Sequence, residues 1–267
     1  MLITSRANAN VKRIRRLFNR RERQRTGLFF AEGVRLVAEA IEMRADIQEL
    51  ILAPELLSKH AAEEVAIIQA RTDIPLLQVT PEVFKSISPK DGQDGAAVVA
   101  RQRWEDIEDL RLSSEICWVA LHQIQHPGSL GTILRVCDAV GGAGLLLMGD
   151  STDPYDPTAV RTSLGAIFSQ RLVKTTFSEF AAWKRRHQYF VVGTSPTAST
   201  DYQAVCYQPP VVLLMGAERI GLSPEQQAVC DLMVRIPMVG RCESHHVGVA
   251  TGIVLYEIFN QRRTVEQ

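Results

Sequence analysis

Five apolar runs in the second half of the chain constrain the fold more than any other feature of the sequence. They span residues 116–121, 145–148, 189–192, 211–215 and 232–236. Segments with helical spacing separate them, and this alternation is typical of a mostly parallel sheet covered on both faces. Because ligands of such sheets bind where strands end and loops begin, we expect the functional residues in the loops that follow the runs.

The first half has the pattern of a smaller α/β domain. Apolar runs at 28–31, 49–53, 75–79 and 96–100 alternate with helical stretches at 34–43, 55–70 and 81–87. Residues 104–115 are polar and charged, which is the composition of a linker. We therefore predict an N-terminal domain over 1–103, a linker over 104–115 and a second domain over 116–267.

Composition narrows the class of protein. The chain has 267 residues, equal numbers of basic and acidic side chains and 46% hydrophobic residues, which excludes a disordered chain or a disulfide scaffold. No run approaches the roughly 18 to 20 apolar residues of a membrane-spanning helix, so we expect no membrane partner. The five cysteines are scattered and odd in number, and we interpret them as reduced thiols of a cytoplasmic protein.

The zero net charge conceals a strongly basic N-terminus. Residues 1–26 contain nine arginines and lysines against Glu22 alone. Between 8 and 25 the apolar residues are spaced three to four apart, which predicts one basic amphipathic helix. Such a surface suits contacts with nucleic-acid phosphates, and a merely solvated helix face is the alternative.

The loop after the first run leads directly into a helix. It extends from His122 through His126 to Gly131, and Arg135 falls off the apolar face of the helix that follows. Glycines allow close backbone approach, and a helix start offers unpaired N–H groups. The alternative is a tight strand-to-helix turn with a solvated arginine.

The loop after the fourth run is glycine-rich but is not a phosphate-binding P-loop. Leu222 and Ser223 stand where such a loop requires Lys and Ser or Thr. Ser223 followed by Pro224 instead predicts the start of a helix. The cluster Gly141-Gly142-Ala143-Gly144 precedes a strand and does not follow one, which disfavours a dinucleotide-binding fold.

The segment after the fifth run ends in a final helix, for which Ser244 is a candidate cap. Cys242, His245 and His246 lie close together before it, with His122 and His126 elsewhere. A metal-dependent enzyme is one interpretation of this cluster. We predict no metal site, because the spacings that zinc sites favour are absent.

These loops together resemble the three motifs of a known family. The residues concerned are Pro127-x-Ser129-x-Gly131-x-Ile133-x-Arg135, then Met215-Gly216-Ala217-Glu218-x-x-Gly221-Leu222, then Ile236-Pro237-Met238-x-Gly240 with Ser244-x-x-Val247-x-Val249-Ala250. They resemble, in this order, the motifs of the SpoU/TrmH-like RNA ribose 2′-O-methyltransferases of the SPOUT superfamily. Residues 161–168 and 29–33 are similar to further segments of that family.

The resemblance implies a fold and an activity. The fold is α/β, with a C-terminal SPOUT domain that has a mostly parallel sheet and a trefoil knot, preceded by a small α/β, L30e-like RNA-binding domain. The activity is methyl transfer from S-adenosylmethionine to a ribose 2′-hydroxyl of rRNA or tRNA, with rRNA favoured. The family also implies a homodimer formed through the C-terminal domain, with both subunits around the reacting ribose.

The resemblance also assigns residues to the site. The catalytic group would comprise Arg135, Glu218, Ser129, Ser244 and His246. The cofactor would be held by Thr194, Met215, Gly216, Ala217, Gly221, Ile236, Met238, His245, Val247 and Ala250. RNA would contact Arg6, Lys12, Arg13, Arg16, Arg20, Arg23 and Arg161. Arginine stays protonated, so we expect Arg135 to bind a phosphate or the developing alkoxide, with Glu218 orienting it or stabilising the loop.

The sequence departs from the family pattern at several positions. Asn is usual where Ser129 stands and an acidic residue where His126 stands, and Ser-Leu-Asn-Val-Ser is usual where this chain has Ser244-His245-His246-Val247-Gly248. His246 has the chemistry either to replace an amide donor or to act as a base. A catalytically silent RNA-binding dimer with the same fold is therefore the second hypothesis.

Overall fold

The computed structural model describes residues 2–71, 73–88, 94–112, 116–208 and 210–265. Contacts divide the chain into two compact units. Unit 1 comprises Met1–Gln102 and Asp153–Ser169, and unit 2 comprises Arg103–Thr152 and Gln170–Gln267. The segment Asp153–Ser169 therefore groups with the N-terminal residues, although it lies within the second half of the sequence.

Unit 2 is built on a parallel sheet. Over the described residues its strand order is β10-β12-β9-β11-β6-β7-β8, and every neighbouring pair is parallel. The strands are β6 (Cys117–His122), β7 (Gly144–Met148), β8 (Arg171–Thr175), β9 (Phe190–Thr194), β10 (Thr200–Asp201), β11 (Val211–Met215) and β12 (Leu232–Arg235). The five apolar runs are thus confirmed as strands of a mostly parallel sheet.

The two strands that the sequence did not reveal lie at the sheet edges. β8 has an exposed lysine, Lys174, next to its last residue, and β10 is only two residues long. An edge strand has one unpaired side and tolerates polar residues. Neither strand therefore produces the continuous apolar run by which the buried strands were recognised.

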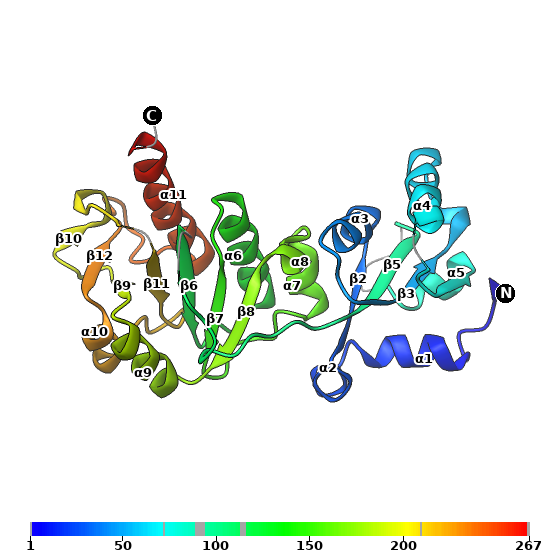
Figure 1. The fold of residues 1–267 in the computed structure, drawn as a ribbon, viewed down its shortest axis with the longest axis horizontal. Helices are drawn as coiled ribbons and strands as arrows, with labels where there is room; N and C mark the ends of the chain where they lie inside the picture. The colour runs from blue at the N-terminus through cyan, green and yellow to red at the C-terminus, as the bar shows by residue number, and fades with distance from the viewer. Residues whose placement is uncertain (1, 72, 89–93, 113–115, 209, 266–267) are drawn as a thin grey trace. The chain divides into compact units, whose positions relative to one another are not determined.

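Helices cover both faces of this sheet (Figure 1). α6 (Pro127–Ala139) and α11 (Val247–Val265) pack together on one face, and α9 (Phe177–His187) and α10 (Pro224–Val229) lie on the other; the 3-10 turn η2 (Tyr202–Ala204) precedes β11. Trp118 of β6 and Trp183 of α9 are fully buried in the core that they share. No helix within the described ranges has the length and apolar character needed to cross a membrane.

Residues 104–112 belong to unit 2 and pack into its core, although their composition is that of a linker. Ile107 and Leu110 are buried in the core beneath α9. The Trp183 indole N–H donates to the Leu110 carbonyl at 3.2 Å, and the Leu112 N–H donates to the Tyr189 hydroxyl at 3.0 Å. The remaining predicted linker residues, 113–115, lie outside the described residues.

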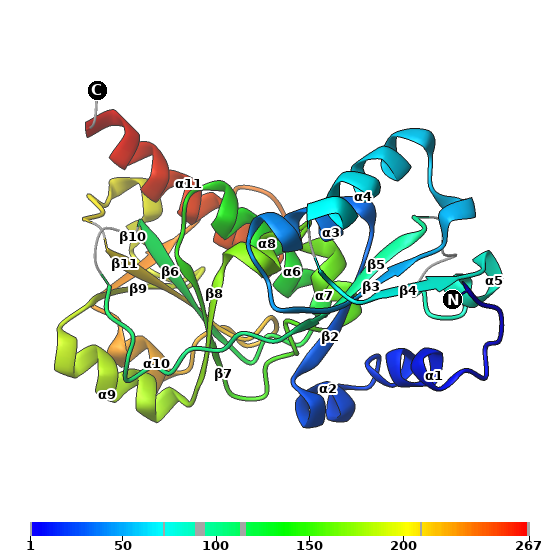
Figure 2. The ribbon, with the colours of Figure 1, turned by 45° about the vertical axis from the view of Figure 1, so that its right-hand side comes forward.

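Unit 1 contains a mixed sheet in the order β1-β4-β3-β5-β2. β1, β4 and β3 run parallel, and β5 is antiparallel to both β3 and β2. Its elements are β1 (Leu2–Ile3), α1 (Ala9–Arg16), α2 (Arg20–Thr26), β2 (Leu28–Glu32), α3 (Val34–Glu42), β3 (Ile47–Leu52), η1 (Pro54–Leu56), α4 (Lys59–Arg71), β4 (Leu76–Val79), α5 (Pro81–Lys85), β5 (Ala96–Arg101), α7 (Pro157–Thr162) and α8 (Ala166–Ser169). α1 and α5 share a core on one side of the sheet, and Figure 2 shows α3 and α4 on the other side.

The prediction of one helix over residues 8–25 is wrong, because the structure has two. Asn19 is the N-cap of α2, and its side chain accepts a hydrogen bond from the Arg21 N–H at 2.8 Å. The Arg23 guanidinium donates to the carbonyls of Leu17 and Phe18 at the break, at 2.8 and 3.0 Å. A helix break needs such partners because its terminal backbone groups lose their intrahelical hydrogen bonds.

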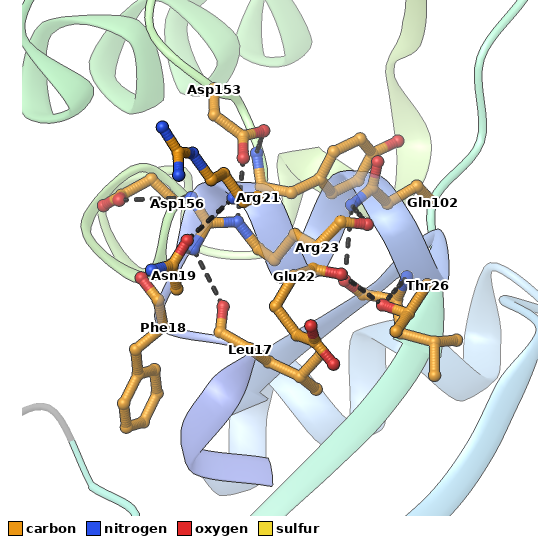
Figure 3. A network of polar contacts seen from close by, with 12 residues as sticks. Leu17, Phe18, Asn19, Arg21, Glu22, Arg23, Thr26, Gln102, Asp153 and Asp156 are labelled. Carbon is orange, nitrogen blue, oxygen red and sulfur yellow. Dashed lines mark hydrogen bonds and ion pairs between the residues drawn. The ribbon is translucent and has the colours of Figure 1, made fainter. Parts of the chain in front are cut away.

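Arg23 also joins α2 to the inserted segment (Figure 3). Its Nε lies 2.8 Å from Asp153 Oδ2, and its Nη2 lies 3.5 Å from Asp156 Oδ2. The Arg23 side chain is 1% exposed. A buried charge is tolerated only when it is paired and hydrogen-bonded, as it is here.

We predict that Arg23→Met destabilises unit 1 strongly. The change removes the partner of the Asp153 carboxylate, which is nearly buried. Breaking a buried ion pair in this way costs about 3–5 kcal/mol. Urea unfolding monitored by circular dichroism measures the effect. The control is Arg25→Met, whose exposed guanidinium pairs with Glu22 and whose removal should leave the midpoint near that of the parent. Equal midpoints for both variants would contradict the prediction.

Candidate functional site

A pocket of about 490 Å³ opens in unit 2 where β9, β11 and β12 end. Thr194, Met215 and Val234, near the carboxyl ends of these strands, contribute to its wall. The Thr194 hydroxyl donates to Met215 Sδ at 3.5 Å, which ties two of the strand ends together. The loops that follow the strands form the rest of the wall, as expected for a parallel sheet.

All ten residues that the family resemblance assigned to the cofactor line this one pocket. They are Thr194, Met215, Gly216, Ala217, Gly221, Ile236, Met238, His245, Val247 and Ala250. Glu218 and Ser244, expected in the catalytic group, also line it. Sequence reasoning missed Ser195, Pro196 and Thr197, which follow β9 directly. The strand-end rule that selected the other loops was the signal that could have identified them.

The loop after β11 is closed tightly on itself. The Gly221 N–H donates to the Ala217 carbonyl at 2.8 Å, and the two residues form an isolated antiparallel bridge. A Cβ at Gly216 would lie only 2.2–2.5 Å from backbone atoms of Gly221 and Leu222. The loop therefore needs glycine at this position because no side chain fits.

Three distant segments meet at the Ser129 hydroxyl. Ser129 Oγ donates to Glu218 Oε1 at 2.9 Å and lies 2.9 Å from His246 Nε2. Ser129 is buried at the start of α6, Glu218 follows β11, and His246 precedes α11. Of the three, only Glu218 reaches the pocket wall. The three motif segments therefore meet at Ser129 Oγ, and the second and third of them line the pocket.

Arg135 and His126 lie outside the pocket wall. Arg135 is exposed on α6. His126 Nε2 lies 3.6 Å from Glu218 Oε2, beyond hydrogen-bond distance, and its side chain is 77% exposed. Among the described residues no group of three His, Cys, Asp or Glu side chains is arranged to hold a metal ion.

Ser244 does not cap the final helix, contrary to the expectation. α11 begins at Val247, and the His246 carbonyl accepts the first helical hydrogen bonds, from the N–H groups of Val249 and Ala250. His246 thus occupies the N-cap position. Ser244 lies two residues earlier, on the pocket wall.

The basic residues expected to contact RNA differ in exposure. Arg6, Lys12, Arg16 and Arg20 are exposed, whereas Arg13 is part-buried and paired with Glu49 at 2.8 Å. Arg23 departs from the expectation, because its buried guanidinium is held by Asp153 and Asp156 and lies out of reach of an RNA phosphate. Its role in this structure is to stabilise the helix break.

Arg161 lies within electrostatic range of a perturbed carboxyl. Burial raises the pKa of Glu32 to about 7, while the hydrogen bond from Ser88 lowers it, the charge of Asp94 raises it and the charge of Arg161 lowers it. Ser88 Oγ is 2.8 Å from both Glu32 oxygens. The folded protein therefore favours the protonated form of Glu32 up to near-neutral pH.

We predict a pH dependence of stability that Glu32→Gln removes. A carboxyl whose pKa is raised from 4.5 to about 7 on folding contributes stability that is fully present below pH 4.5 and is lost as the pH rises through about 7. The midpoint of thermal unfolding of the parent, relative to that of Glu32→Gln, should therefore fall across this window. Glu42→Gln, at an exposed position on α3, is the matched control. Parallel pH curves for the parent and Glu32→Gln would refute the assignment.

We predict that Gly216→Ala opens the loop after β11. The added methyl group cannot occupy the space held by the Gly221 and Leu222 backbone, so the loop must shift. Such overpacking costs about 1–3 kcal/mol of folding free energy, and the midpoint of thermal unfolding should therefore fall by several degrees. Gly240→Ala is the control, because a Cβ there meets nothing within 4 Å. If both variants have the same midpoint of thermal unfolding as the parent, the loop is not closed as described.

Comparison with known proteins agrees with the site. The SpoU rRNA methylase family model matches residues 117–256, and a model of the MRM3-like substrate binding domain matches 8–97. A 23S rRNA (uridine(2479)-2′-O)-methyltransferase of Streptomyces viridochromogenes is 30% identical, covering 97% of this chain and 92% of the relative.

Solved structures match over nearly the whole chain. An AdoMet-bound rRNA methyltransferase from Sinorhizobium meliloti is 34% identical with a TM-score of 0.87, covering 99% of this chain and 98% of that one. The SpoU methyltransferase AviRb from Streptomyces viridochromogenes, in complex with AdoMet, is 28% identical with a TM-score of 0.87, covering 96% and 99%. The family model covers more than half of the chain, and this chain therefore belongs to the SpoU rRNA methylase family.

Proposed function

We propose that the protein is an RNA methyltransferase that transfers the methyl group of S-adenosylmethionine to a ribose 2′-hydroxyl. The observation on which this rests is that residues of the second and third motifs line one pocket in unit 2, and that Ser129 of the first motif donates a hydrogen bond to Glu218 on its wall. Two relatives are named 23S rRNA 2′-O-methyltransferases, and two structural neighbours are described with AdoMet bound. We favour rRNA over tRNA as the substrate for the same reason.

The pocket residues fit S-adenosylmethionine. A volume of about 490 Å³ is within the range of cofactor pockets, and the wall combines apolar side chains such as Met215, Ile236 and Met238 with backbone of glycine-containing loops. The Gly216 position, where a Cβ would collide with backbone, keeps the wall compact. When bound, the cofactor supplies an electrophilic methyl group on a positively charged sulfur.

The protein's own contribution is positioning. Glu218 presents a carboxylate on the pocket wall, and its orientation is fixed through Ser129. Arginine is a poor proton acceptor, so Arg135 would bind an RNA phosphate or stabilise the developing alkoxide. Aligning a hydroxyl with a methyl donor in a pocket that excludes water accounts for a large part of the rate enhancement in such reactions.

We also propose a homodimer formed through unit 2, with a C-terminal trefoil knot. The position of Arg135, exposed on α6 and outside the pocket wall, supports a site that a second subunit completes. The 46% exposed Tyr256 and 50% exposed Val249 on α11 support an interface on the face formed by α6 and α11.

Residues 1–103 would bind RNA through an L30e-like domain, and 116–267 would form the methyltransferase domain. The exposed Arg6, Lys12, Arg16 and Arg20 support an RNA surface on unit 1. Unit 1 also has the MRM3-like match and an α/β arrangement. We place the protein in the cytoplasm, consistent with its unpaired cysteines.

The test is methyl transfer to rRNA in vitro. The purified protein is incubated with radiolabelled S-adenosylmethionine and rRNA from cells that lack the gene, and the product nucleosides are separated by mass. A single 2′-O-methylated ribose nucleoside is expected. No methylated nucleoside, together with no heat of S-adenosylmethionine binding at millimolar concentration, would support the silent RNA-binding dimer instead.

We predict that Arg135→Ala lowers the rate of methyl transfer by about 10²–10³-fold, the usual effect of losing one group that stabilises charge in the transition state. S-adenosylmethionine affinity, measured by calorimetry, should be nearly that of the parent because Arg135 lies outside the pocket wall. Arg185→Ala, at an exposed position on α9, is the control and should keep the parent rate. Full activity of Arg135→Ala would remove its assigned role.

A further inference from the structure

Two hydrogen bonds fix the His246 ring. The Gly248 N–H donates to His246 Nδ1 at 3.2 Å, so Nδ1 is an acceptor. His246 Nε2 lies 2.9 Å from Ser129 Oγ, and in the tautomer whose Nδ1 accepts, the Nε2–H is the donor of that contact. The Ser129 hydroxyl in turn donates a hydrogen bond to Glu218 Oε1 at 2.9 Å.

The side chains at positions 129, 246 and 248 fit one another in size. Ser129 is 4% exposed and has a short side chain, so a partner must extend far enough to reach it. His246 does so with the distal nitrogen of its ring. A Cβ at position 248 would lie 3.2 and 3.3 Å from the His246 ring atoms Cε1 and Nδ1, and 3.3 Å from Thr132 Cγ2. The absence of a side chain at Gly248 therefore leaves room for the ring.

We propose that Ser129, His246 and Gly248 form one mutually adapted donor unit whose task is to orient the Glu218 carboxylate on the pocket wall. His246 is then a positioning residue that donates a hydrogen bond, and it is not the base that removes a proton from the ribose. This inference rests on the proposed methyltransferase function. It accounts for three of the positions at which the sequence departs from the family pattern as a single compensated change.

Activity of His246 variants tests the direction of the hydrogen bonds. His246→Gln places an amide N–H near the position of Nε2, whereas the amide of His246→Asn reaches only to the position of Nδ1. We expect His246→Ala and His246→Asn to lose about tenfold in kcat, the effect of about one hydrogen bond, and His246→Gln to regain most of that loss. The pH profile of His246→Gln should match that of the parent. A shifted profile, or loss in His246→Gln equal to that in His246→Ala, would overturn the donor assignment.

A double-mutant cycle tests the matched lengths. Ser129→Asn lengthens one side of the contact and His246→Asn shortens the other, so each single variant should lose activity. The double variant Ser129→Asn/His246→Asn should be more active than either single variant, which is non-additive coupling of residues in contact. Additive losses would show that the two positions act independently and would overturn the proposal.

The role of Gly248 is tested by Gly248→Ala in two proteins, the parent and the Ser129→Asn/His246→Asn double variant. Gly248→Ala should lower activity in the parent because the new methyl group presses on the His246 ring and on Thr132. In the Ser129→Asn/His246→Asn background the ring is gone, and the same substitution should cost less. An equal loss of activity from Gly248→Ala in both proteins would contradict the mutual adaptation of the three residues.

A measurement without RNA separates this proposal from the proposed function. In protein labelled with ¹⁵N histidine, NMR of the parent should show the His246 Nδ1 unprotonated and Nε2 protonated, with assignment from the missing signals of His246→Gln. The opposite tautomer overturns the donor unit even if methyl transfer is observed. The expected tautomer together with absent methyl transfer would leave the donor unit standing and reject the enzyme.

Discussion

The parallel alignment of the strands in unit 2 determines where everything else lies. Every neighbouring pair in that sheet is parallel, so the loops after β9, β11 and β12 leave from the same edge. Side chains far apart in sequence are thereby brought within hydrogen-bond distance. Ser129, Glu218 and His246 meet in this way, and the pocket lies beside them. A mixed sheet, such as that of unit 1, would send successive loops to opposite edges.

The strands that can be predicted from this sequence are those that form apolar runs. β6, β7, β9 and β11 do so because side chains on both of their faces enter a core, whereas β12 is apolar over Leu232–Val234 with Val234 alone buried among its described residues. β8 and β1 lie at sheet edges and do not form apolar runs, so the sequence did not reveal them. The break between α1 and α2 escapes for another reason. Helical spacing continues through it, and the interactions that stabilise it involve Asp153, which is 130 residues from Arg23.

The membership of the pocket could be predicted, but its internal bonding could not. Resemblance to a family identified the ten wall residues by their place in three motifs. It left open whether His246 replaces an amide or acts as a base. The Gly248 N–H that donates to Nδ1 supports the first of these roles, and backbone geometry of that kind has no signature in residue order. The packing of Ile107 and Leu110 likewise shows that polar composition does not decide whether a segment is a free linker.

The grouping of Asp153–Ser169 with unit 1 means that a single cut of the chain releases neither unit intact. The segment lies between β7 and β8 in sequence, yet its Tyr155 and Phe168 rings pack against Phe29 at 4.7 and 5.8 Å. A fragment ending near Gln102 would lose those aromatic neighbours and the carboxylates around Arg23. The remaining fragment would expose the same apolar surface to water. The two halves of this protein are therefore expected to be inherited, exchanged or lost together.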